Sequence, residues 1–168
     1  MSEMKVNIRE ARSNDAGVIL ELIKALAEFE KLSHEVVATE EKIRATLFGE
    51  TPAARVLIAE LQTESGVTNA GFALYFTTYS TFLAKPGLYL EDLFVRPEHR
   101  SHGIGQKLLA ELAQRTLDLN GGRLEWSVLN WNKRAWEFYA RLGAKPMEEW
   151  TVHRLTGSAL EKLAKETN

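Results

Sequence analysis

The chain has 168 residues and a mass of 18.9 kDa, with 45% hydrophobic and 26% charged side chains, a composition typical of a single globular domain over residues 1–168. Its 21 basic and 23 acidic residues give a net charge of −2, so no global charge favours nucleic acid or an anionic membrane. Cysteine is absent, which excludes disulfides, thiolate zinc sites and a cysteine-linked acyl intermediate.

Signals for targeting and for metal binding are also missing. No apolar run approaches the roughly 20 residues that cross a bilayer, and the first residues are charged and polar rather than signal-like. We therefore expect a cytoplasmic protein without a membrane partner. His99 and His102 share one loop, where a solvated role is favoured over metal ligation, so we expect no metal.

The first third of the chain predicts one strand and two helices. Residues 6–10 alternate as a strand does, and the polar run that follows supplies capping side chains for a helix over about 15–31. Glu30 lies near the end of that helix, where a carboxylate opposes the macrodipole, although a solvated surface glutamate is the commoner explanation. A second helix is predicted over about 39–48.

The next segment predicts an antiparallel hairpin and a loop. Residues 55–62 and 70–78 are rich in strand-forming side chains and flank a polar turn, which is the pattern of a hairpin. Residues 79–87 end in Pro-Gly and are predicted to form a loop.

The strand that follows changes phase partway along. Leu88 and Leu90 share one parity, whereas Leu93 and Val95 share the other, which indicates a β-bulge near Glu91-Asp92. A bulge can separate neighbouring strands and open a slot for an extended ligand. The alternative is a central strand buried on both faces, which would need no phase.

A basic loop with two spaced glycines leads from this strand into an amphipathic helix. Residues 100–105 read Arg-Ser-His-Gly-Ile-Gly, and the helix runs to about Leu119. Glycine lets a backbone approach a ligand, and the bare N–H groups of a helix N-terminus bind phosphate. A dinucleotide fingerprint would need a third glycine where Leu108 stands, and the Walker spacing is absent as well. Taken alone, Gly-x-Gly is also an ordinary helix start.

The last segment predicts two strands and two helices. A strand over 123–129 precedes a short helix with Asn132 as its cap, and a strand over 150–155 precedes a terminal helix from Ser158. Taken alone, Tyr139 is typical of a core tyrosine with a bonded hydroxyl rather than of a catalytic one.

Together these elements predict the α/β class: a single mixed, mostly antiparallel sheet with a splayed central strand pair and helices on both faces. Ligands in such sheets bind beyond the carboxyl ends of strands. The Gly103 loop and Asn132 each follow a strand, so both would border one cleft.

The strand Leu-Tyr-Leu-Glu-Asp-Leu-Phe-Val, followed by Arg-x-x-Gly-x-Gly, resembles the acetyl-CoA signature of the GNAT N-acetyltransferase superfamily. The segment Leu-Tyr-Leu-Glu-Asp is similar, more narrowly, to the spermidine/spermine (diamine) and thialysine N-acetyltransferase branch. The resemblance covers nearly the whole chain. It implies direct transfer of an acetyl group from acetyl-CoA to a primary amine of a small diamine, polyamine or lysine-like substrate in a ternary complex, and it implies a homodimer.

The resemblance also implies roles for individual residues. Tyr139 would protonate the departing thiolate, and Glu91 would take the proton of the amine, directly or through water; alternatively, Glu91 merely bonds the exposed N–H groups of the bulge. The positions assigned to acetyl-CoA are Leu93, Phe94, Val95, Arg100, Ser101, His102, Gly103, Ile104, Gly105, Gln106, Asn132, Arg134, Ala135 and Tyr139.

On the acceptor side, a small polycation would favour carboxylates. The positions assigned to the amine substrate are Phe29, Glu30, Glu91, Glu125, Trp126 and Glu149, with Glu148 as the alternative to Glu149. Phe29 stands where the polyamine branch carries tyrosine, so a lysine-like amine or a short diamine fits as well as spermidine. The alternatives are a protein, peptide or aminoglycoside N-acetyltransferase on the same scaffold, and a non-catalytic acyl-CoA-binding module.

Overall fold

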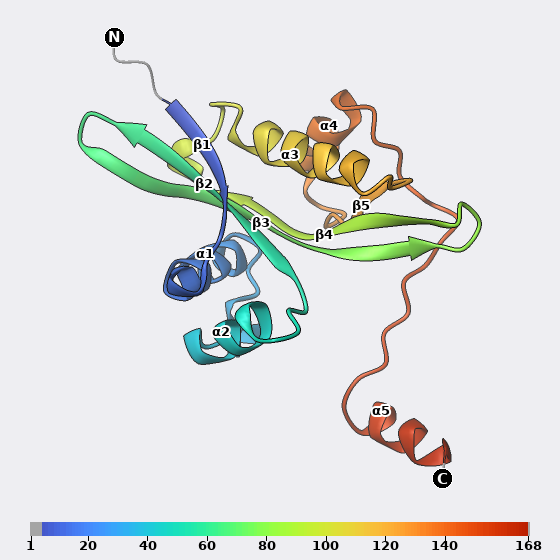
Figure 1. Ribbon diagram of the computed structural model, residues 1–168. Coiled ribbons are helices and arrows are strands. Elements are labelled where there is room, and N and C mark those ends of the chain that lie inside the picture. The colour runs from blue at the N-terminus through green and yellow to red at the C-terminus, as the bar shows by residue number, and fades with distance from the viewer. Residues whose placement is uncertain (1–4, 168) are drawn as a thin grey trace. The chain divides into compact units, whose positions relative to one another are not determined.

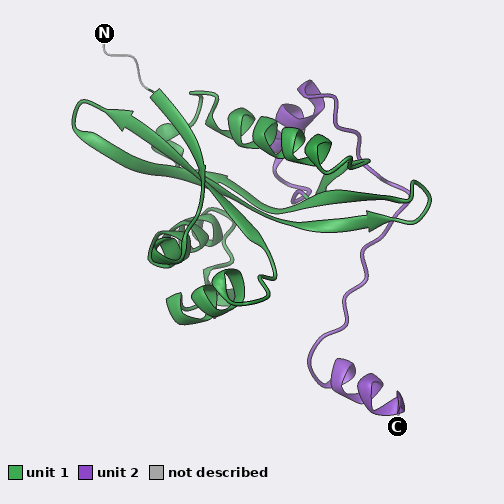
Figure 2. Cartoon of the chain, viewed as in Figure 1, with its two compact units in different colours: residues 1–127 green, residues 128–168 purple. Residues whose placement is uncertain are grey.

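The computed structural model describes residues 5–167, which fall into two compact units with the boundary after Ser127 (Figure 2). Each unit is described by itself. Among the described residues, no helix is both long and apolar enough to span a membrane.

The first unit contains a five-stranded sheet in the order β1-β2-β3-β4-β5 (Figure 1). Neighbouring strands are antiparallel, except that β4 and β5 are parallel. This arrangement confirms the predicted mixed, mostly antiparallel sheet. The elements of this unit are β1 (Lys5–Glu10), α1 (Ala16–Phe29), α2 (Glu40–Phe48), β2 (Arg55–Thr63), β3 (Gly66–Ser80), β4 (Lys85–Val95), α3 (Ile104–Asp118) and β5 (Leu124–Trp126).

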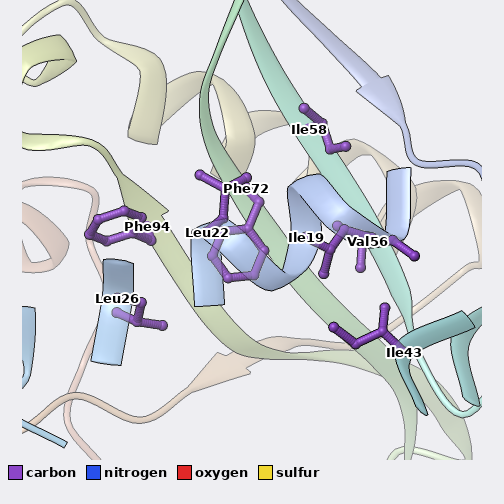
Figure 3. Close-up of a cluster of buried hydrophobic side chains, with 9 residues drawn as sticks. Ile19, Leu22, Leu26, Ile43, Val56, Ile58, Phe72 and Phe94 are labelled. Atoms are coloured by element: carbon purple, nitrogen blue, oxygen red, sulfur yellow. The ribbon is translucent and has the colours of Figure 1, made fainter. Parts of the chain in front are cut away.

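Helices cover both faces of the sheet, with α1 and α2 on one face and α3 on the other (Figure 1). On the α1 face, Ile19 and Leu22 pack against Val56, Phe72 and their neighbours, as Figure 3 shows. Burying each such side chain contributes about 1.5–3 kcal/mol. On the opposite face lie the alternate strand residues together with Leu108 and its helix neighbours, which are also buried.

The predicted bulge is confirmed. Tyr75 pairs with Leu90 and Leu74 with Asp92, so Glu91 is the extra residue of β4. Because side chains alternate along a strand, the extra residue places Leu90 on the α3 face and Asp92 on the α1 face. The change of phase in the sequence therefore has a structural cause.

The splay between β4 and β5 is confirmed as well. Their ladder ends where Leu90 pairs with Trp126, whereas β4 continues to Val95. β5 has only three residues and is shorter than the predicted strand over 123–129. The last part of β4 therefore keeps a free edge in the described sheet.

The prediction of a loop over 79–87 is wrong. β3 runs to Ser80 and β4 begins at Lys85, so only a tight turn separates them. Pro86 suggests a break, but the backbone nitrogen two residues on, at Leu88, bonds the Arg123 carbonyl on the far side of β4. The nitrogen of Pro86 faces that same side, so the ladder with β3 loses no hydrogen bond.

The second unit contains α4 (Lys133–Arg141) and α5 (Gly157–Ala164). The predicted strand over 150–155 is wrong, since those residues have no regular structure. Trp150 and Val152 alternate as in a strand, but alternation forms a strand only where another strand is available to pair, and none lies among the described residues of this unit.

Candidate active site

The loop between β4 and α3 ends in an uncapped helix N-terminus. Gly103 is the N-cap of α3, has φ 73°, and provides no side-chain cap. The first hydrogen bond of the helix runs from the Lys107 amide to the Gly103 carbonyl, over 3.0 Å. The amides of Ile104, Gly105 and Gln106 therefore precede the first bonded turn, and such N–H groups bind phosphate oxygens. These residues fit the diphosphate of coenzyme A.

The free edge of β4 offers a second contact surface for an extended ligand. The Arg96 amide bonds Ala70 of β3, so the backbone groups of Leu93 and Val95 alternate onto the opposite edge, beyond the end of β5. Phe94 faces β3 instead, where a Cβ on Gly71 would collide with the Phe94 carbonyl. Gly71 thus permits the close approach that positions this part of β4.

Arg100, in the loop between β4 and α3, lies against the end of α1. Its Nε donates to the Val95 carbonyl over 2.9 Å. Its guanidinium carbon lies 4.4 Å from the centroid of the Phe29 ring and 5.7 Å from that of Phe94. Contacts of this kind contribute about 0.5–2 kcal/mol each. The sequence assigned Arg100 to the donor and Phe29 to the acceptor, and the structure brings the two together.

Three carboxylates gather at the bulge and the end of α1. Glu91 is exposed, Asp92 is half-buried on the α1 face, and Glu30 follows the last helical residue, Phe29. Burial, reinforced by the charges of Glu91 and Glu30, raises the pKa of Asp92 to about 6. Burial also raises the pKa of Glu30. Within residues 5–167, no basic side chain forms an ion pair with any of the three.

Asp92 was missed as a site residue by sequence reasoning. The signal was present in the same change of phase that predicted the bulge. A bulge at Glu91 places Asp92 on the opposite face of the sheet from Leu90, which is the face of the buried Phe94. A carboxylate on the face that a helix covers is a candidate for chemistry, since burial shifts its pKa.

The predicted acceptor residues of β5 face opposite ways. Glu125 pairs in register with Tyr89 and Trp126 with Leu90, so the two side chains lie on different faces of the sheet. The carboxylate of Glu125 forms an ion pair with Arg123 Nε over 2.8 Å.

The predicted site residues beyond Ser127 belong to the second unit. Asn132 is the N-cap of α4, and its side-chain oxygen accepts from the Ala135 amide over 3.2 Å; Arg134 lies in the first turn. Burial raises the pKa of Tyr139 to about 12. Glu148 and Glu149 are exposed in a segment without helix or strand.

Comparison with known proteins places this chain in a family. Residues 20–144 match the acetyltransferase (GNAT) family. The chain is 43% identical to a thialysine N-epsilon-acetyltransferase of Bos taurus, with 95% of this chain and 97% of the relative covered. It is 34% identical to an L-ornithine N5-acetyltransferase of Arabidopsis thaliana, with coverage of 94% and 87%.

Solved structures agree on the fold. An integron cassette protein from the mobile metagenome of V. cholerae superposes with a TM-score of 0.75 and 27% identity, covering 97% of this chain and 99% of that one. A ribosomal-protein-alanine N-acetyltransferase from Brucella melitensis superposes with a TM-score of 0.68 and 16% identity, covering 91% and 100%. These findings confirm both the predicted fold class and the predicted enzyme class. The chain belongs to the acetyltransferase (GNAT) family and is an acetyl-CoA-dependent N-acetyltransferase.

Proposed function

We propose that the acetyl acceptor is the side-chain amine of a small lysine-like amino acid, or one amine of a short diamine. The observation that carries this proposal is the group Glu30, Glu91 and Asp92, three carboxylates at the bulge and the end of α1 for which residues 5–167 supply no ion-pair partner. An organic ammonium would supply the missing positive charge and lower the mutual repulsion of the carboxylates. The relatives named for thialysine and ornithine support the same acceptor class.

The donor side of the proposal uses two surfaces of this chain. When bound, acetyl-CoA supplies the thioester whose carbonyl carbon the amine attacks. The amides of Ile104, Gly105 and Gln106 hold its diphosphate. The backbone groups of Leu93 and the Val95 amide, on the edge of β4 beyond β5, align its extended arm, while the Val95 carbonyl stays bonded to Arg100. The bulge at Glu91 lies next to that edge and can donate an N–H to the oxyanion.

The acceptor must lose a proton before it reacts. An alkyl ammonium has a pKa near 10.4, so little free amine exists at neutral pH. Glu91, at the bulge, takes this proton directly or through water. Asp92, whose pKa is raised to about 6, holds a proton more tightly than an ordinary aspartate does, which suits it to assist in the transfer.

Tyr139 assists the departure of the thiolate of coenzyme A. Its pKa of about 12 keeps the phenol protonated at every working pH. A neutral phenol donates a hydrogen bond to the departing sulfur, and it releases its proton only as negative charge develops there.

A homodimer and a cytoplasmic location also belong to this proposal.

An amine panel tests the acceptor class. Thiol release from acetyl-CoA would be followed with thialysine, ornithine, lysine, 1,5-diaminopentane, spermidine, an aminoglycoside and a peptide amine. The largest kcat/KM is expected among the first four. Preference for the aminoglycoside or the peptide would contradict the proposal in favour of the larger acceptors, and coenzyme A binding without turnover of any amine would favour the binding module.

A further inference from the structure

The contact between Arg100 and Phe29 joins two parts of the site that sequence reasoning treats separately. Arg100 lies in the loop between β4 and α3, residues 96–103, which we call the donor loop. Phe29 is the last helical residue of α1, directly before Glu30. The guanidinium carbon lies 4.4 Å from the centroid of the Phe29 ring, while Nε is fixed by the Val95 carbonyl. One side chain therefore contacts both the donor loop's own strand and the end of the acceptor-side helix.

Both ends of this contact adjoin backbone in the left-handed region. Lys31, two residues after Phe29, has φ 60°, and Ser101, directly after Arg100, has φ 68°. Neither is glycine, so both conformations are unfavourable and persist only where the surroundings hold them. At Lys31, the amide of Leu32 also bonds the Ala27 carbonyl over 2.7 Å, which fixes the direction in which the chain leaves α1.

We propose that Phe29 and Arg100 form a brace that positions Glu30 beside Asp92 and links the donor loop to the amine site. Phe29 is then a positioning residue that acts through Glu30, rather than a residue that touches the amine. Arg100 serves the same brace through its planar guanidinium, which a lysine ammonium cannot reproduce because it cannot stack and bond the Val95 carbonyl at once. The inference rests on the proposed acceptor site.

The pKa of Asp92 reports on the brace, because it depends on groups that the brace holds in place. The charged groups that act on it are Glu91 on β4 and Glu30 at the end of α1, and burial under α1 adds to them. If the end of α1 relaxes, Glu30 and part of the covering apolar surface move away. The pKa of Asp92 then falls, and the acid limb of the kcat/KM profile moves to lower pH.

The experiment compares three purified full-length variants. In Phe29→Leu, the KM for the amine should rise roughly fivefold or more, the acid limb should move to lower pH, and the affinity for coenzyme A alone should stay within about twofold of wild type. Phe29→Tyr keeps the ring and should behave as wild type. Phe48→Leu is the matched control, because Phe48 is likewise a phenylalanine at the last position of a helix, α2, and should leave both the KM and the pH profile unchanged.

Three results would overturn the brace: a wild-type KM and acid limb in Phe29→Leu, an equal loss in Phe29→Tyr, or an equal loss in Phe48→Leu. Arg100→Lys is a second test, since this variant should bind both the amine and coenzyme A more weakly than wild type does. If wild type prefers an amine outside the lysine-like class, the proposed acceptor is wrong. The brace is then tested by measuring the KM and the pH profile of the same variants with the preferred amine. Without any turnover, calorimetric titration of the amine in the presence of coenzyme A replaces the KM.

Discussion

The two ends of α1 carry carboxylates in opposite surroundings. At the start, Asp15 receives two bonds from Arg9, of 2.8 and 2.9 Å, and a third from the Arg12 amide of 2.7 Å. Arg9 holds the pKa of Asp15, and that of Glu60, below their usual values. At the end, Glu30 lies beside Asp92, neither forms an ion pair with another described residue, and burial raises the pKa of both.

The difference separates a structural use of carboxylates from a chemical one. Asp15 ties the start of α1 to β1 through Arg9, and its negative charge is already neutralised there. The carboxylates at the other end keep unfavourable charge that a bound ammonium would relieve. A protein retains such charge at a cost in stability where a ligand or a reaction uses it.

The largest expected effect sharpens this comparison through activity. In Glu91→Gln the bulge keeps its shape but loses the group that we propose takes the amine proton, so kcat/KM should fall about 100-fold or more. Steady-state thiol release measures it. Glu60→Gln is the control, because Glu60 is committed to Arg9 and Asn7 and should leave kcat/KM near wild type. Equal losses in the two variants would remove the distinction.

Tyr139→Phe is expected to lower kcat at least tenfold. The variant removes the hydroxyl that we propose hydrogen-bonds to the departing sulfur, and it keeps the ring, whose centroid lies 5.3 Å from that of Phe138. Single-turnover kinetics separate this chemical step from product release. An undiminished rate in this variant would exclude Tyr139 from the mechanism.

A stability measurement can break the comparison. Arg9→Met leaves Asp15 and Glu60 unpaired and should lower the free energy of unfolding by about 2 kcal/mol, less than a fully buried pair would cost, because the Arg9 side chain is 29% exposed. Asp92→Asn removes one of the clustered carboxylates and should not destabilise. Urea unfolding measures both. A loss in Asp92→Asn as large as that in Arg9→Met would show that Asp92 is structural.

The smallest expected effect is a difference in pH dependence. The pKa of Asp92 rises from its ordinary value near 4 to about 6 on folding, so its contribution to stability is greatest below pH 4 and is lost as the pH rises through 6. Asp15 has a lowered pKa and contributes the reverse: its stabilisation is present above pH 4 and is lost as the pH falls further. Between pH 4.5 and 7, Asp92→Asn should therefore gain about 1–2 kcal/mol relative to wild type. A constant difference over that range would contradict the raised pKa.

Patterns that lie within one element were readable from the sequence. The bulge at Glu91 follows from a change of parity, and the two spaced glycines after it predict the helix N-terminus that the structure places at Gly103. The enzyme family followed from these motifs in combination. Each inference needed only neighbours along the chain.

Features that depend on contacts between distant segments were not readable. The end of α1 approaches β4 only in the fold, so neither the raised pKa of Asp92 nor the contact of Arg100 with Phe29 could be derived from spacing. The strand predicted over 150–155 fails for the same reason, since alternation does not supply a pairing partner. Pro86 misled the prediction because the sequence does not show which edge of the strand its nitrogen faces. In the fold that nitrogen faces the edge away from β3, where it interrupts no hydrogen bond of the β3–β4 ladder.

The most direct test of the account is a crystal structure with coenzyme A and thialysine bound together. We predict that the diphosphate lies on the amides of Ile104, Gly105 and Gln106, and that the side-chain nitrogen of thialysine lies within hydrogen-bond distance of Glu91 or Asp92. A nucleotide bound elsewhere, or an amine that contacts none of the carboxylates at the bulge, would contradict the account.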